Sequence, residues 1–195
     1  MRIANSLAGL AAVALMVAAS VGSVFAADPE NTMIITLESG EVTIALRPDL
    51  APKHVEQIKQ LVRSGQYDNV VFHRVIDGFM AQTGDVQFGD KQDGYDLRRA
   101  GTGGSDLGNI PAEFTPTPFA RGTVGMARSR NPNSANSQFF IMFADGDFLN
   151  GQYTVFGEVE SGMELVDGIK KGSQAANGAV DDPDRMIKVE IAADK

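Results

Sequence analysis

The stretch "FHRVIDGFMAQTGD", residues 72–85, begins with a strand pattern, continues into a turn, and places a single arginine among apolar side chains. Strand alternation puts Arg74 on one face with Phe72 and Ile76. Both faces are apolar, so the alternation does not show which one packs into the core. No cysteine, serine or adjacent carboxylate pair accompanies the arginine. The stretch therefore supplies a charged hydrogen-bond donor without a nucleophile beside it.

Upstream, two runs with alternating apolar residues predict an antiparallel hairpin at residues 33–37 and 42–46, with its turn at Ser39-Gly40. A helix is predicted next, over residues 49–65, from apolar residues at helical spacing with a proline in the first turn and a glycine past the end. The domain therefore opens with two strands and a helix.

The rest of the chain predicts short strands and a second helix. That helix, over residues 161–172, has Ser161 and Glu164 at capping-box spacing. The predicted strands are short apolar or alternating runs at residues 70–76, 122–129, 137–143, 153–160 and 186–193. Many strands with two distant helices favour a closed or nearly closed antiparallel barrel with its ends covered by the helices.

The composition limits the classes of function. The chain of 195 residues, 43% hydrophobic and 22% charged, fits one domain, and its formal charge of -8 excludes a nucleic-acid footprint. With no cysteine, disulfides, thiol catalysis and cysteine-based zinc sites are excluded. His54 and His73 lack metal-ligand spacing. We expect neither a metal nor a cofactor, and no nucleic-acid partner.

The N-terminal segment has the order of a secretory signal peptide. Arg2 precedes an apolar, alanine-rich run that ends on small residues near Ala26. We expect cleavage after Ala26, which leaves residues 27–195 as the mature domain in the periplasm, without a membrane span. The alternative is an uncleaved anchor in the inner membrane, since the run is nearly long enough to span a bilayer.

Several catalytic patterns are absent. The aspartates at 77, 85, 145 and 147 stand beside glycines in turn contexts, and no G-x-S-x-G motif occurs. The glycine-rich residues 101–108 lack the lysine of a phosphate loop. A long stretch rich in glycine, aspartate and proline, residues 88–117, predicts a surface loop, where binding residues often lie.

Two predicted strands place a polar group among aromatics. In residues 137–143, Gln138, Phe140 and Met142 share one face, and aromatic or aliphatic residues fill the other. Together with the arginine-bearing stretch, this pattern indicates an apolar pocket with a few placed hydrogen-bonding groups.

Five motifs in this sequence resemble the cyclophilin-type peptidyl-prolyl cis-trans isomerases over about residues 32–192. These motifs are "FHRVIDGFMAQTGD", "GTGG", "GTVGMARS", "NSQFFIMF" and "FLNGQYTVFGEV". The resemblance implies a closed eight-stranded antiparallel β-barrel capped by two α-helices. It also implies catalysis of X-Pro isomerisation (EC 5.2.1.8), with proline-containing polypeptides as clients, and we expect a monomer.

The resemblance also assigns site residues. Arg74 matches the catalytic arginine. The substrate-binding positions are Phe79, Met80, Gln82, Gly101, Ala127, Arg128, Gln138, Phe140, Phe148, Leu149 and Tyr153.

This chain departs from the best-known eukaryotic pattern at three of those positions. Phe148 replaces tryptophan, Tyr153 replaces histidine and Arg128 replaces asparagine, as in bacterial members. We expect weaker binding of cyclosporin, while Arg128 still offers its backbone groups to a peptide.

Two alternatives come from other classes of function. The first is a proline-peptide binding module or holdase chaperone without catalysis, which the intact Arg74 and its pocket disfavour. The second is a lipocalin-type barrel with an apolar lumen, which the phenylalanines on both faces of residues 137–143 disfavour, since they would fill the interior. Accelerated refolding of a proline-limited client separates all three.

Overall fold

The computed structural model describes residues 28–92 and 95–195. The predicted signal peptide, residues 1–26, lies outside the described residues. The eight strands among them form one antiparallel sheet in the order β3-β4-β6-β5-β7-β2-β1-β8. The strands are β1 Thr32–Leu37, β2 Gly40–Leu46, β3 Arg74–Ile76, β4 Met80–Thr83, β5 Thr123–Met126, β6 Phe139–Met142, β7 Val155–Ser161 and β8 Lys188–Ile191.

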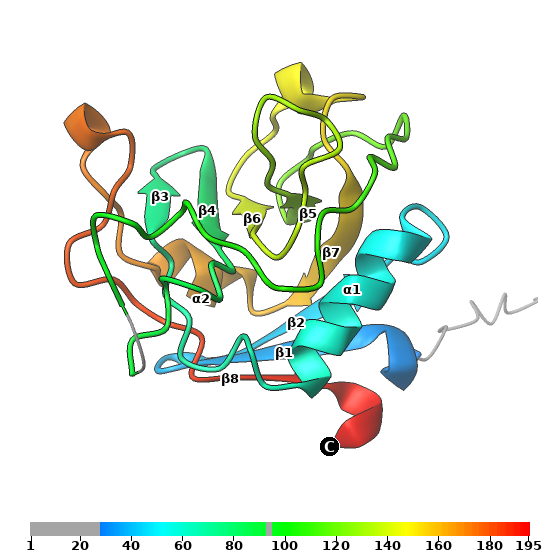
Figure 1. The fold of residues 1–195 in the computed structure, drawn as a ribbon, viewed down its shortest axis with the longest axis horizontal. Coiled ribbons are helices and arrows are strands. Elements are labelled where there is room, and N and C mark those ends of the chain that lie inside the picture. The colour runs from blue at the N-terminus through cyan, green and yellow to red at the C-terminus, as the bar shows by residue number, and fades with distance from the viewer. Residues whose placement is uncertain (1–27, 93–94) are drawn as a thin grey trace, which may run out of the picture.

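Two helices pack on this sheet (Figure 1). Helix α1, Pro52–Arg63, contacts β7 and β8, and helix α2, Met163–Gly168, contacts β2. The long loop over residues 88–117 has no helix or ladder strand among its described residues, as predicted. The fold is mostly β, with eight antiparallel strands and two helices.

The expectation of a closed barrel is wrong. The sheet curls but its ladder stays open, because β3 and β8 are edge strands that do not pair with each other. Only the segments that precede them meet, where Phe72 N–H donates to Asp184 O at 2.8 Å and Met186 N–H donates to Val70 O at 2.9 Å. The residues at 70–73 take these partners in place of a ladder, which is why β3 is shorter than the predicted strand at 70–76.

Two local predictions also need correction. The first hairpin turns at Glu38-Ser39, since Gly40 already pairs with Leu37 in the ladder. The capping box is wrong because Ser161 is the last residue of β7, and α2 begins after Gly162, whose φ of +82° favours glycine.

The stretch at 72–85 also contains a strand that its strand-then-turn pattern did not indicate. Strand β4 follows the turn and pairs with β3, which gives a strand, a turn and a strand.

The two faces of the curled sheet pack into two apolar clusters, and this settles which side of each strand is core. The large cluster inside the sheet contains Val75, Phe139 and Ile141, together with the apolar face of α1. The smaller cluster on the other face contains Met80 and Phe140. The inside is therefore filled by side chains, which excludes the lumen of a lipocalin-type barrel.

Candidate functional site

The β3–β4 hairpin brings Arg74 and Gln82 side by side. Gly78 stands in its turn with a φ of +70°, a left-handed conformation that glycine adopts without strain. Across the hairpin, Arg74 is paired with Gln82 and Ile76 with Met80, so these four side chains share the face opposite the main core. The unpredicted strand β4 is thus what positions two of the site residues.

The Arg74 guanidinium is held by neutral oxygen atoms. Its Nε donates to Asn177 O at 3.0 Å, Nη2 donates to Asn177 Oδ1 at 3.1 Å, and Nη1 donates to Gln82 Oε1 at 3.2 Å. Partial burial lowers the pKa of Arg74, yet a guanidinium remains protonated in such surroundings. Arg74 therefore presents a full positive charge, and no carboxylate of residues 28–92 or 95–195 is bonded to it.

A chain of amides continues from this arginine to the glycine-rich loop. Gln82 Nε2 donates to Gln138 Oε1 at 3.0 Å, and Gln138 Nε2 donates to Gly103 O at 2.8 Å. Each amide uses its carbonyl oxygen toward the arginine side and its NH₂ group toward the loop. This series of hydrogen bonds fixes the orientation of both glutamine side chains, and through Gln82 it also fixes the guanidinium of Arg74.

Asp85 holds the glycine-rich loop at the far end of this chain. The fully buried carboxylate accepts hydrogen bonds from Gly101 N–H at 2.7 Å and Gly103 N–H at 2.9 Å. A Cβ at position 103 would lie 2.4 Å from Asp85 Oδ1, so the close approach requires glycine there. From the sequence we explained Asp85 by its turn context alone. The structure shows that it also holds the glycine-rich loop in place.

The cavity beside Arg74 measures about 420 Å³ and has largely apolar side chains in its wall. Phe79 and Phe148 form part of its wall with ring centroids 5.5 Å apart, and Phe140 meets Tyr153 edge to face at 5.9 Å. The lining consists of Arg74, Phe79, Met80, Gln82, Ala127, Arg128, Phe140, Phe148, Leu149, Gln152 and Tyr153.

A second cavity of about 300 Å³ adjoins the first and shares Gln82, Ala127 and Arg128 with it. Its other lining residues are mostly polar or glycine, and they are Gly101, Thr102, Gly103, Ser129, Ser134, Asn136 and Gln138. All twelve site residues expected from the sequence line one cavity or the other. Their individual roles remain predictions.

Arg128 lies where the two cavities meet. Its guanidinium donates to Gln152 O from Nε at 3.1 Å and Nη2 at 2.8 Å, and to Ser129 O from Nη1 at 2.9 Å. It also lies over the Tyr153 ring, 4.3 Å from the centroid, in a cation–π contact. The side chain of Arg128 is therefore a fixed part of the groove, beyond the backbone groups expected from the sequence.

Asn177 is the site residue that sequence reasoning missed. It follows the short 3-10 helix Gln174–Ala176 in a left-handed conformation, with φ of +53°, and both of its oxygens accept from Arg74. The Asn-Gly pair at 177–178 signals a turn. Nothing in that pair indicates that the turn lies against an arginine 103 positions away.

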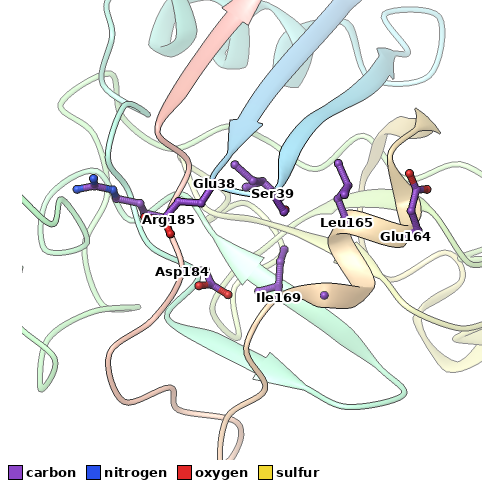
Figure 2. A pocket seen from close by; sticks show the side chains of 9 residues that line it. Glu38, Ser39, Glu164, Leu165, Ile169, Asp184 and Arg185 are labelled. Carbon is purple, nitrogen blue, oxygen red and sulfur yellow. The ribbon is translucent and has the colours of Figure 1, made fainter.

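A third cavity, of about 320 Å³, lies away from these residues (Figure 2). It is bounded by the β1–β2 turn, by α2 and by the segment before β8, and its lining includes Glu38, Glu164, Asp184 and Arg185. It contains none of the residues of the other two cavities. We take the two adjoining cavities as the candidate site, because apolar walls and fixed donors converge only there within residues 28–92 and 95–195.

Two features that would point to other functions, a metal-binding cluster and a membrane-spanning helix, are absent from the described residues. No group of three or more histidine, cysteine, aspartate or glutamate side chains in this part of the chain is placed to hold a metal ion. None of the helices within the described ranges combines the length and the apolar character needed to cross a membrane.

Comparison with known proteins shows which family this chain resembles. The family model described as "Cyclophilin type peptidyl-prolyl cis-trans isomerase/CLD" matches residues 32–191. A "Probable peptidyl-prolyl cis-trans isomerase" of Brucella suis is 65% identical over 192 residues, covering 98% of this chain and 97% of the relative. "Peptidyl-prolyl cis-trans isomerase B" of Escherichia coli is 38% identical over 147 residues, covering 71% and 84%.

Solved structures agree with the fold. A cyclophilin from Hirschia baltica superimposes with a TM-score of 0.72 at 27% identity, covering 86% of this chain and 76% of the other. A cyclophilin-type peptidyl-prolyl cis-trans isomerase of Cryptosporidium parvum, crystallised in the presence of the dipeptide Ala-Pro, gives a TM-score of 0.68 at 26% identity, covering 82% and 98%.

Proposed function

Since the chain belongs to the cyclophilin-type peptidyl-prolyl cis-trans isomerases and catalyses rotation about the bond that precedes proline, we propose that its clients are proteins folding after export, with Arg74 as its catalytic residue. The apolar cavity beside Arg74 is then the proline pocket. The observation on which this proposal depends is the placement of an uncompensated guanidinium at the edge of that cavity.

Rotation about an X-Pro bond needs no nucleophile. The planar amide resists rotation with a barrier of about 18–20 kcal/mol, and unassisted isomerisation takes tens to hundreds of seconds. In the twisted transition state the prolyl nitrogen is pyramidal and regains a lone pair. A hydrogen bond donated to that nitrogen is stronger in the transition state than in the planar ground state, which is the condition for acceleration.

Arg74 has a donor left for this task. A guanidinium carries five N–H groups. Within the part of the chain that the structure describes, one of them on Nη2 has no acceptor, after the bonds to Asn177 and Gln82 and a weak contact from Nη1 to Met80 Sδ at 3.9 Å. That N–H is available to the prolyl nitrogen. The apolar wall formed by Phe79, Met80, Phe140 and Leu149 holds the ring while the other side of the bond turns.

The catalytic role is tested with Arg74→Ala in a protease-free assay of X-Pro peptide isomerisation. We expect kcat/KM to fall by about 10²–10³-fold, the usual effect of removing one transition-state donor, while calorimetric binding of the peptide is largely retained. Arg130→Ala is the matched control, because Arg130 is exposed and lines neither cavity. Wild-type kcat/KM in the Arg74 variant would remove the mechanism.

The proposal of export is supported by the composition of residues 1–26, with one arginine ahead of an apolar run that ends on small residues. The compartment would be the bacterial periplasm. The test is the intact mass of the protein recovered from its native host. A mass that begins at Ala27 in the periplasmic fraction is expected, whereas full-length protein in the membrane fraction would establish the anchored alternative.

A further inference from the structure

The candidate groove is cationic on an acidic protein. The chain has 25 acidic against 17 basic residues. The two adjoining cavities nevertheless contain two arginines, Arg74 and Arg128, and not one carboxylate among their described lining residues. The sign of charge in the groove is thus opposite to that of the whole molecule.

Neither arginine is neutralised by a neighbour. Among the residues that the structure describes, Arg74 and Arg128 donate only to amide and backbone carbonyl oxygens, apart from the sulfur contact of Arg74. Some arginines elsewhere are paired with carboxylates, such as Arg47 with Asp49 at 2.7 Å and Arg121 with Asp167 at 2.6 Å. The groove is therefore a place where positive charge is left for a ligand.

Arg128 has the free donors and the position to meet a charged client. Its three bonds to Gln152 O and Ser129 O leave two of five N–H groups without an acceptor in the described part of the chain. The Tyr153 ring beneath the guanidinium fixes its plane. A peptide that runs from the proline pocket into the second cavity passes this side chain, since Arg128 lines both.

We propose that the groove selects X-Pro segments with an aspartate or glutamate within two residues of the proline, and that Arg128 is the residue that recognises this charge. The inference rests on the proposed function of the same site. A carboxylate matches the planar fork of a guanidinium, whereas a lysine there meets a like charge. Arg74 does not serve this purpose, because it lines only the first cavity and is assigned to the prolyl nitrogen in the proposed function.

The overall negative charge does not cancel this preference. Repulsion between an acidic client and the protein surface acts at long range and is screened beyond about 8 Å at physiological ionic strength. A contact with Arg128 within the groove is screened much less. The preference is therefore best measured at about 0.15 M salt, where the local contact dominates.

The test is a set of X-Pro peptides with glutamate, glutamine or lysine placed in turn at the two positions before and the two after the proline. We expect wild-type kcat/KM to favour glutamate over lysine about fivefold at one or more positions, the scale of a partly exposed ion pair. Arg128→Gln should reduce this ratio to below about twofold. Arg128→Lys, which keeps the charge and loses the fork, should retain part of it.

Arg130→Gln is the control, since it removes the same charge from an exposed residue two positions along the same segment. It should keep the wild-type ratio. A glutamate-to-lysine ratio that is unchanged in Arg128→Gln, or equally reduced in Arg130→Gln, would overturn the inference. Failure of the proposed function is a separate result, because it would appear as absent turnover of the neutral glutamine peptides by the wild-type protein.

Discussion

The Arg74 guanidinium donates three hydrogen bonds to oxygen atoms, and two of them go to one residue, Asn177. The left-handed backbone of Asn177, with φ of +53°, turns its carbonyl and its side-chain oxygen toward the same guanidinium. Asparagine tolerates that conformation better than most residues do. Gln82 supplies the contact from the other side, so the guanidinium is held between the hairpin and a loop.

We predict that Asn177→Ala lowers kcat of isomerisation about three- to tenfold with little change in KM, because positioning of a transition-state donor affects catalysis more than ground-state binding. Steady-state kinetics on one X-Pro peptide measures the split. Gln174→Ala, at an exposed position of the same loop, should leave both constants unchanged. A rise in KM without a fall in kcat would show that Asn177 acts on binding instead.

Sequence reasoning at this scale succeeded for residues within one motif and failed for partners across the chain. The family resemblance placed Arg74 and Gln82 in one site, whereas strand alternation put Arg74 on one face with Phe72 and Ile76 and did not decide which face is buried. The reason is visible in β6, where Phe139 packs in the main core while its neighbour Phe140 packs in the outer cluster. When both faces are covered, a period of two contains no information about the inside.

At the scale of elements, α1 begins without a local cap. Ala51 at its N-cap offers no side-chain acceptor. The carboxylate of Glu113, from the long loop, accepts instead from Lys53 N–H at 3.2 Å, from His54 N–H at 3.1 Å and from His54 Nδ1 at 2.6 Å. Burial acts to raise the pKa of Glu113, but these hydrogen bonds outweigh it and keep the pKa below its ordinary value. The loop is thus fastened to the helix.

We predict that Glu113→Gln lowers the free energy of unfolding by about 1–2 kcal/mol, since it removes a charged cap at the positive end of the helix dipole. Urea denaturation followed by circular dichroism measures this difference. Glu160→Gln is the control, because Glu160 is exposed on β7 and removes the same charge. Equal losses in the two variants would contradict the capping role.

At the scale of the whole molecule, buried histidines make stability depend on pH. His73 is 5% exposed, and burial lowers its pKa from 6.5 to about 4, with Arg74 acting in the same direction and Asp85 against it. Burial also lowers the pKa of His54, although Glu113 opposes the change. Burial thus favours the neutral form of both histidines, and for His73 the unfolded chain binds more protons than the folded protein between about pH 4 and 6.5.

We therefore predict that the contribution of His73 is fully present above pH 6.5 and is lost as the pH falls from there toward 4. Its share is about 2 kcal/mol between pH 7.5 and pH 5. Urea unfolding at the two pH values measures the loss, and His73→Leu should show a smaller loss than the wild-type protein. The same loss in both proteins would place the pH dependence elsewhere.

Most strands and both helices could be predicted, because each depends on a local pattern, as the hairpin of β1 and β2 shows. The expectation of a closed barrel failed for a different reason. Closure depends on how residues 70–72 pair with the residues just before β8. These two segments are more than a hundred positions apart in the sequence. Alternation identifies strands, but it does not state which distant edges pair.

The loop that holds Arg74 also covers the outer edge of β3. Val75 N–H donates to Gly178 O at 2.8 Å, and Gly172 N–H donates to Val75 O at 2.9 Å. An uncovered edge strand is a template for pairing with another extended chain. With this edge occupied from within, a client that approaches β3 finds no backbone to pair with. The loop that positions the arginine therefore also protects this edge of the sheet from edge-to-edge pairing.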